Sequence, residues 1–275
     1  MIVLEDLDRK ERQLRDLVRS LESVVVAFSG GVDSALVLKI AGDELGDRAL
    51  GITARSESLA ASELEGALGF AASVGARHEV LETHELEDPN YLANPENRCY
   101  FCKKELYGRL SEIARERGAK WIVDGFNLDD ASDWRPGRKA AGEFGVRSPL
   151  AEAGFAKSDV RALAKKLNLE VWDKPALACL SSRFPYGTPI TLELLQQVDR
   201  AEEAVHAAGI RICRVRHHGE VARIEVPESE IERLAERGVR ERVAAGVKAA
   251  GYRYVSLDLG GYVSGNLNVR TPPHG

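Results

Sequence analysis

A short run of β-branched residues that passes directly into a glycine turn constrains the fold of this chain more than any other feature. The segment 23–28 reads Ser-Val-Val-Val-Ala-Phe, which is typical of a strand buried on both faces of a parallel sheet. The hexapeptide 29–34 (SGGVDS) follows at once, and the pattern over 34–41 is helical. A strand, a tight turn and a helix in this order predict the first unit of a parallel α/β sheet.

The same alternation continues through the first half of the chain. An amphipathic helix is expected over 4–21, further helices over 62–74 and 103–117, and strands over 48–54, 77–81 and 121–125. Repeated strand–helix units predict a doubly wound parallel sheet with right-handed crossovers. The loops after Phe28, Ala54 and Gly125 should therefore lie along one edge, where ligands usually bind.

The second half of the chain has a different pattern. Residues 174–189 are rich in proline, glycine and serine, and mark a linker or an active-site loop. Beyond them we expect helices over 192–208 and 231–250, and short strands over 211–216, 222–226 and 252–257. The sequence therefore predicts an α/β domain over residues 1–185 and a smaller α+β domain over residues 186–275.

The glycine turn has the composition of a phosphate-binding loop. Its two glycines allow backbone N–H groups to point inward, and the following helix adds a positive N-terminal dipole. The turn lacks the lysine and the spacing of a Walker loop, so release of pyrophosphate from ATP fits better than simple phosphoryl transfer. A tight turn without a ligand is the alternative. The residues expected to contact ATP or pyrophosphate are Ser29, Gly30, Gly31, Asp33, Ser34, Ala54 and Gly125.

Three acidic residues near the predicted sheet edge are candidates for magnesium binding. Asp33 lies inside the glycine turn, where its carboxylate can orient the nucleotide or its Mg²⁺. Asp129 and Asp130 follow the strand that ends at Gly125, and carboxylate oxygens are ligands that Mg²⁺ prefers. Solvated loop acids are the alternative for this pair.

The four cysteines of the chain point to metal or sulfur chemistry. They are too few and too clustered for the disulfide framework of a secreted protein. Cys99 and Cys102 form a C-x-x-C ahead of a helix, and Cys179 lies in the Pro/Gly-rich segment. Three thiols suit an iron–sulfur cluster with one open iron, a zinc site completed by a histidine, or a redox pair; buried, unreactive thiols are the alternative. Cys213 is expected in the core.

Basic residues gather near the second-domain strand expected over 211–216. Arg214 and Arg216, together with Arg183, are candidates for binding a phosphate or carboxylate of the substrate. The alternative is an exposed, charged edge strand. Glu202 belongs to a helix face and is also a candidate for substrate contact.

Charge and composition limit the class of partner. The formal net charge of −5 gives no reason to expect DNA or RNA as a ligand, whereas a small anionic nucleotide remains compatible through a local basic patch. The first residues are charged and no apolar stretch approaches the length of a bilayer, so a cytoplasmic protein without a membrane partner is expected.

Three segments together resemble a known family. With the glycine turn, the segment 179–183 (CLSSR) and the segment 214–219 (RVRHHG) in one chain, the sequence resembles the LarE family of sulfur transferases over nearly its whole length. The resemblance implies the PP-loop ATP pyrophosphatase fold of the NAD and GMP synthetases. It also implies adenylation of the carboxylates of pyridinium-3,5-biscarboxylic acid mononucleotide and their conversion to thiocarboxylates, in biosynthesis of the nickel-pincer nucleotide cofactor.

The resemblance assigns roles to the cysteines. Cys179 takes the position of the sulfur-donating cysteine, which in some members gives up its own sulfur and becomes dehydroalanine. Members with two further cysteines, like Cys99 and Cys102, are similar to forms in which three thiolates hold a [4Fe-4S] cluster with a transferable sulfide. The three-cysteine form is expected here, with ATP and Mg²⁺ as cofactors and a homo-oligomer, with a hexamer as the candidate assembly.

The sequence departs from the family pattern at one position and leaves rival functions open. Family members often place an arginine where this chain has Val263, within segment 260–268. A PP-loop tRNA thiolase is the main rival, but it would favour a broad basic surface. An amide-forming synthetase leaves the three cysteines unexplained, and a non-enzymatic nucleotide sensor is the third rival.

Overall fold

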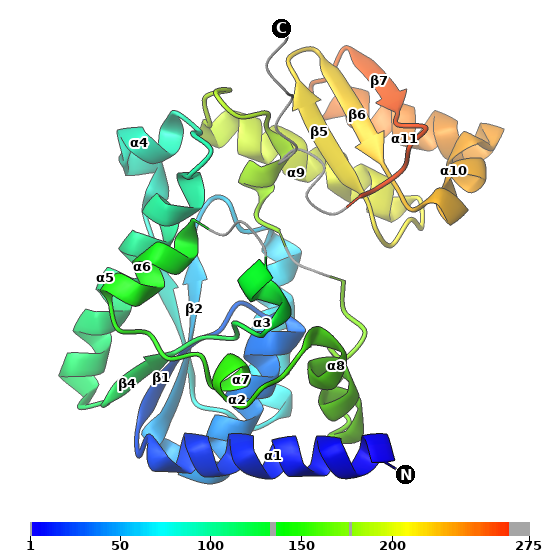
Figure 1. Cartoon of the computed structure of the whole chain (residues 1–275). Coiled ribbons are helices and arrows are strands. Elements are labelled where there is room, and N and C mark those ends of the chain that lie inside the picture. The colour runs from blue at the N-terminus through cyan, green and yellow to red at the C-terminus, as the bar shows by residue number, and fades with distance from the viewer. Residues whose placement is uncertain (1, 133–135, 176–177, 264–275) are drawn as a thin grey trace, which may run out of the picture. The chain divides into compact units, whose positions relative to one another are not determined.

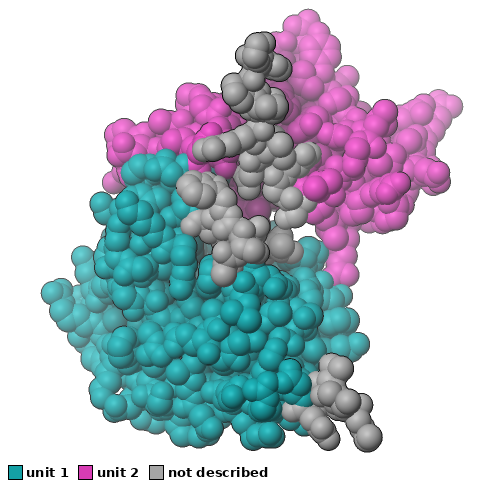
Figure 2. Space-filling model, in the orientation of Figure 1, with its two compact units in different colours: residues 1–85, 97–177 teal, residues 86–96, 178–275 magenta. Residues whose placement is uncertain are grey.

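The computed structural model describes residues 2–132, 136–175 and 178–263, and divides into two compact units. The first comprises residues 1–85 and 97–177, and the second comprises residues 86–96 and 178–275 (Figure 2). The crossing from the first unit to the second falls inside the Pro/Gly-rich segment 174–189, of which 176–177 lie outside the described residues. The domain boundary after residue 185 stays a prediction.

A four-stranded parallel sheet forms the centre of the first unit (Figure 1). The strands are β1 (Val24–Ala27), β2 (Ala49–Arg55), β3 (His78–Glu82) and β4 (Trp121–Val123), in the order β3-β2-β1-β4. All pairings are parallel, which confirms the predicted sheet. Chain order moves outward from β1 through β2 to β3 and then returns to the other side of β1, so the sheet has a switch point between β1 and β4.

Helices cover both faces of this sheet. In Figure 1, α5 and α6 lie on one side of the sheet, whereas α1, α2 and α8 lie on the other. The predicted helices over 4–21, 34–41, 62–74 and 103–117 are confirmed within a few residues at each end, but the three helices between 137 and 166 were not predicted. The helices of this unit are α1 (Ile2–Ser20), α2 (Val32–Leu45), α3 (Ala61–Ser73), α5 (Arg98–Arg117), α6 (Gly137–Glu143), α7 (Pro149–Glu152) and α8 (Lys157–Lys166).

The uninterrupted apolar run in β1 is explained by burial on both sides. Val24 and Val26 belong to the core cluster formed with α1, α2 and α8, whereas Val25 belongs to the cluster formed with α5 and β4. Successive side chains of a strand point to opposite faces, so a strand covered by helices on both faces has no polar alternate position. The sheet is thereby held as a rigid base for the loops at its carboxyl edge.

The second unit contains a three-stranded sheet packed on helices. Its elements are α4 (Pro89–Leu92), α9 (Leu192–Ala207), β5 (Arg214–His218), β6 (Val221–Glu225), α10 (Glu228–Ala235), α11 (Arg237–Ala249) and β7 (Tyr254–Leu257). β5 and β6 pair antiparallel, whereas β6 and β7 pair parallel. The predicted smaller α+β unit is therefore confirmed in architecture.

Two element predictions in this unit are wrong in detail. The strand expected over 211–216 begins only at Arg214, and Cys213 is buried just before it. The helix expected over 231–250 is two helices, because the backbone of Glu236 is extended (φ −56°, ψ 137°) and ends one helix while beginning the next. The apolar period runs on through this break, so the pattern alone does not reveal it. No helix in the described ranges has the length and apolarity to cross a bilayer.

Candidate active site

The glycine turn joins β1 to α2 and is braced by its own hydroxyl groups. Gly30 has a positive φ of 76°, which glycine adopts without strain, and the extended Gly31 caps the helix that begins at Val32. Ser34 Oγ accepts a hydrogen bond from Ser29 N (3.1 Å) and donates one to Gly31 O (3.1 Å). The backbone of the turn is thus fixed at the N-terminus of a 14-residue helix, in the arrangement that favours an anion.

The loop after β4 lies directly against this helix N-terminus. A Cβ atom at Gly125 would be 2.5 Å from Ser34 N and 2.9 Å from the carbonyl carbon of Asp33. Gly125 is therefore required for close approach of the two backbones. Ala54 lies near the carboxyl end of the neighbouring β2 and is half-buried, so three strand ends meet where a nucleotide is expected.

A hydrogen-bonded network joins the three predicted magnesium carboxylates. Asp33 accepts hydrogen bonds from Asn127 Nδ2 (3.0 Å) and from Lys157 Nζ. Asn127 Oδ1 in turn accepts from Asp129 N (3.0 Å), and Asp130 Oδ2 accepts from Asn127 N (3.1 Å). Asp129 Oδ2 accepts from Lys157 N (2.8 Å). The sequence predicted these carboxylates, and the structure adds the Asn127 amide and the Lys157 amine that connect them.

Two lysines border the turn and were not predicted. The Lys157–Asp33 ion pair is only part-buried, with side-chain exposures of 33 % and 21 %, so a ligand can reach it. Lys174 Nζ donates to Gly30 O (3.3 Å) and pairs with Glu63 (2.8 Å). Two cations at a helix N-terminus suit a polyphosphate. Lys157 lies in the first turn of α8, whose amphipathic pattern is visible in the sequence. A helix over these residues was nevertheless not predicted.

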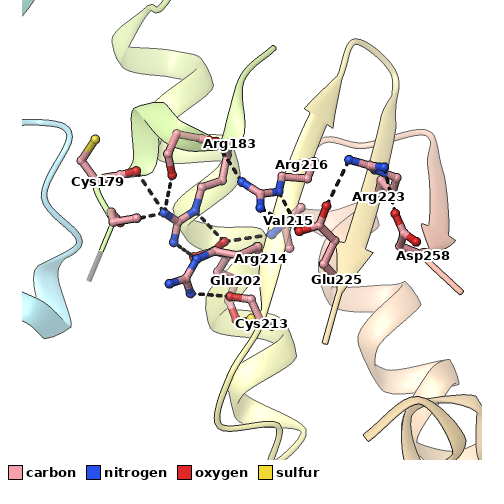
Figure 3. Close-up of polar contacts among 12 residues, drawn as sticks. Cys179, Arg183, Glu202, Cys213, Arg214, Val215, Arg216, Arg223, Glu225 and Asp258 are labelled. Atoms are coloured by element: carbon pink, nitrogen blue, oxygen red, sulfur yellow. Dashed lines mark hydrogen bonds and ion pairs between the residues drawn. The ribbon is translucent and has the colours of Figure 1, made fainter. Parts of the chain in front are cut away.

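In the second unit, a buried ion pair lies behind Cys179 (Figure 3). Arg183 pairs with both carboxylate oxygens of Glu202, at 2.9 Å from Nε and 2.8 Å from Nη2. Its third nitrogen donates to the carbonyl oxygens of Ala178 (2.7 Å) and Cys179 (3.0 Å). Burial alone would raise the pKa of Glu202, but attraction to Arg183 outweighs burial and holds that pKa below its ordinary value.

A second buried pair continues the network into the sheet. Arg216 on β5 donates to Glu225 on β6 from two nitrogens, at 2.9 Å and 2.7 Å, and to Ser182 O at 2.9 Å. Arg223 contacts the other oxygen of Glu225 (3.1 Å) and also Asp258 (2.8 Å). The expected substrate-binding residues Arg183 and Arg216 thus have buried carboxylate partners within the chain.

Arg214 occupies a different environment from its neighbours. Its guanidinium stacks over the ring of Tyr262 at 5.2 Å and donates to Cys213 O (2.7 Å). Burial and the charge of Arg183 lower the pKa of Arg214, although an arginine stays charged near neutral pH. Arg214 is half-buried.

The expected cluster cysteines are distributed over both units. Cys99 is exposed and Cys102 is half-buried, one turn apart on α5, and Cys102 Sγ donates to the buried Glu85 (3.3 Å). Cys179 is exposed and belongs to the second unit. Within the described residues of either unit, no three His, Cys, Asp or Glu side chains gather at a metal-binding distance. Cys213 is buried as predicted, and burial raises the pKa of its thiol, which keeps it protonated.

Comparison with known proteins decides the family. The chain is 42 % identical over 263 residues to the pyridinium-3,5-bisthiocarboxylic acid mononucleotide synthase of Lactiplantibacillus plantarum, covering 95 % of each chain. The chain belongs to the LarE family. Uncharacterised proteins of Synechocystis (47 % over 262 residues, 95 % of this chain and 98 % of the relative) and Methanocaldococcus jannaschii (28 % over 259 residues, 94 % and 98 %) are also similar to this LarE-family chain. No protein-family profile matches it.

Proposed function

We propose that this chain is an ATP-dependent sulfur transferase that converts the carboxylates of pyridinium-3,5-biscarboxylic acid mononucleotide into thiocarboxylates, in nickel-pincer nucleotide biosynthesis. The observation that carries the proposal is the hydroxyl-braced glycine turn, with Asp33 held by an amide and an amine at the start of α2. Similarity to a named bisthiocarboxylic acid mononucleotide synthase supports the choice of substrate.

The first step is adenylation. A carboxylate oxygen of the substrate attacks the α-phosphorus of ATP, the bond to the bridging oxygen breaks, and pyrophosphate leaves. The N–H groups at the start of α2, together with the Lys157 and Lys174 amines beside the glycine turn, would stabilise the negative charge that gathers on the departing pyrophosphate. The product is an acyl adenylate with AMP as leaving group.

Mg²⁺ is the expected partner of ATP. Asp33, Asp129 and Asp130 carry the oxygen donors that this ion prefers and are linked through one network. In the part of the chain that the structure describes, these three carboxylates do not by themselves gather at a metal-binding distance, so ATP phosphate oxygens would have to complete the coordination. Bound there, the ion would neutralise charge on the phosphate oxygens. With Asp33 turned to the ion, the Lys157 amine would be released towards the pyrophosphate.

The second step is sulfur transfer. A sulfur nucleophile attacks the acyl carbon and expels AMP, and the exposed Cys179 is the candidate for this chemistry. In the sacrificial route, the Cys179 thiolate forms a thioester. Loss of the Cα proton then breaks the Cβ–Sγ bond, and this gives the thiocarboxylate and a dehydroalanine without any external oxidant or reductant.

A [4Fe-4S] cluster is the expected alternative source of sulfur. Cys99, Cys102 and Cys179 would hold it, and their thiolate chemistry fits the group. Such a cluster would supply a transferable sulfide at its open iron and allow more than one turnover.

Two variants separate the steps of this proposal. Asp33→Ala should abolish AMP formation, whereas Cys179→Ala should leave adenylation intact and remove sulfur transfer. Full thiocarboxylate product from Cys179→Ala would contradict the proposed sulfur route.

Iron and acid-labile sulfide of protein purified without oxygen test the cluster. About four irons and four sulfides per chain, lost in Cys99→Ala, would support it. Absence of iron after reconstitution would return Cys179 to the sacrificial role. We also propose a homo-oligomeric assembly, which light scattering tests and a purely monomeric protein would contradict.

A further inference from the structure

The buried guanidinium of Arg183 hydrogen-bonds to the backbone of the loop that carries Cys179. Cys179 precedes a short 3₁₀ helix (Leu180–Arg183), and Arg183 at its end is only 4 % exposed. Arg183 Nη1 contacts the carbonyl oxygens of Ala178 and Cys179 and also Ser182 Oγ (3.0 Å). In Figure 3 the Cys179 side chain points away from the Arg183 guanidinium, whereas the Cys179 carbonyl oxygen points towards it.

The hydrogen-bonding capacity of Arg183 is directed inside the chain. Each of its three nitrogens donates to a protein oxygen, two of them to Glu202 and the third to the loop. Glu202 is itself fixed, because Val215 N donates to its Oε1 at 2.8 Å and because its carboxylate is buried. A guanidinium whose charge is paired and whose three nitrogens all donate within the chain has little left to offer an anionic substrate.

Two further contacts, which do not involve Arg183, hold Ser181 and Ser182 of the loop. Arg216 Nη1 contacts Ser182 O at 2.9 Å, and Ser181 Oγ lies 2.6 Å from the hydroxyl of the buried Tyr91. The backbone around Cys179 is therefore tied down on both sides, while the Cys179 side chain itself is exposed. A loop built in this way presents one thiol in a fixed direction.

We infer that Arg183, held by Glu202, is a positioning residue that fixes the peptide groups on either side of Cys179 and so aims the Cys179 sulfur, and that it does not bind substrate. The inference rests on the proposed role of Cys179 in sulfur transfer. Misplacement of a reacting group by about 1 Å costs roughly 100-fold in rate. Loss of this clamp, meaning the Arg183 contacts to Glu202, Ala178 O and Cys179 O, should therefore lower kcat for sulfur transfer about 100-fold. KM for the mononucleotide and the single-turnover rate of pyrophosphate release, which precedes sulfur transfer, should stay unchanged.

The test combines a structural readout with a kinetic one on the full-length protein. Arg183→Lys keeps the charge but loses the fork that reaches Glu202 and the loop carbonyls together. Hydrogen–deuterium exchange should increase at least tenfold for the amides of residues 180–184, and kcat for thiocarboxylate formation should fall as stated. Arg237→Lys is the control, because Arg237 pairs with Glu241 on α11 and has no hydrogen bond to residues 178–184, Glu202 or Glu225 in the described chain. The control should change neither readout.

A milder variant covers the case in which Arg183→Lys does not fold. Glu202→Gln keeps the shape of the partner and removes its charge, so the same two changes should appear with smaller size. Unchanged exchange at 180–184 in a folded variant would overturn the clamp, whatever the activity. A raised KM with unchanged kcat would overturn it in favour of substrate binding.

The exchange measurement is independent of the proposed reaction. If exchange rises in the variants but the wild-type protein transfers no sulfur, the proposed function fails while the clamp on the Cys179 loop stands.

Discussion

Replacement of Gly125 by alanine should disable ATP chemistry without unfolding the protein. The added Cβ would lie 2.5 Å from Ser34 N and 2.9 Å from Ser34 Cα, and the three nearest atoms all belong to backbone at the start of α2. Ordinary van der Waals contact for a Cβ begins near 3.4 Å. The helix N-terminus and the loop after β4 must therefore separate by about 1 Å, since no flexible side chain is present to yield.

The size of the effect follows from this displacement. A shift of about 1 Å in a group that positions the reacting phosphate costs roughly 100-fold, which corresponds to about 2.7 kcal/mol in the activation barrier. Overpacking of a well-packed contact costs roughly 1–3 kcal/mol of folding stability. A domain of this size tolerates that loss with a lower melting temperature, so the catalytic defect should be visible in folded protein.

The assay is substrate-dependent formation of AMP and pyrophosphate, with thermal unfolding measured in parallel. Gly69→Ala is the matched control, because Gly69 lies on the exposed face of α3 with nothing within 4 Å of a built Cβ. That control should stabilise the protein by about 0.5–1 kcal/mol and keep full activity. Wild-type adenylation by folded Gly125→Ala would refute the requirement for close approach at the turn.

Three further results are expected. Lys157→Gln should reduce AMP formation at least tenfold with little change in melting temperature, because it removes a part-exposed cation from the proposed pyrophosphate site; unchanged rates would exclude that role. Thr191→Ala should cost about 1 kcal/mol in the free energy of unfolding measured with denaturant, because Thr191 Oγ1 caps α9 by accepting from Leu194 N (3.3 Å); a change below 0.2 kcal/mol would contradict the cap. The lowered pKa of Glu202 means that its pairing stabilises the fold above its unfolded pKa of about 4.5, and that this stability is lost as pH falls through the folded value. In Glu202→Gln, the free energy of unfolding should therefore fall less steeply as the pH is lowered through the acid range. An unchanged slope would contradict the pairing.

The sheet and the glycine turn were predictable because their signals are local. The apolar run before Ser29 has no polar alternate position, which is the pattern of a strand buried on both faces, and the two glycines follow within the same segment. The buried strand and the turn after it can therefore both be predicted from one contiguous segment. The two neighbouring strands followed from the same alternation, although β2 ends at Arg55 and β4 ends at Val123, two residues before the predicted end at Gly125.

The polar partners of the site were not predictable, because their pairing is set by the fold. Asn127 and Lys157 meet Asp33 across 94 and 124 residues of sequence. The chain between Asn127 and Lys157 contains two short helices, α6 with 7 residues and α7 with 4 residues. Helices this short show little hydrophobic periodicity in the sequence. The sequence predicted the carboxylates of Asp33, Asp129 and Asp130, but it could not predict the amide and amine groups that bind them.

The roles of the basic residues in the second unit also depended on tertiary contacts. The sequence marks Arg183 and Arg216 as a cationic group suited to an anion, and their buried partners Glu202 and Glu225 lie on separate elements. Segment 86–96 joins the same unit through the hydrogen bonds from Gly187 N to Asn94 O and from Ile190 N to Leu92 O, both 2.9 Å. The sequence pattern therefore predicts neither the arginine–glutamate pairs nor the contact of segment 86–96 with the second unit.

The most direct test of the proposed sulfur transfer is mass spectrometry of the mononucleotide after incubation with anaerobically purified protein, ATP and Mg²⁺. We expect replacement of carboxylate oxygen by sulfur, with one AMP formed for each sulfur transferred and no product without ATP. AMP formation with a product that contains no sulfur, or the absence of any ATP-dependent change in the mononucleotide, would contradict it.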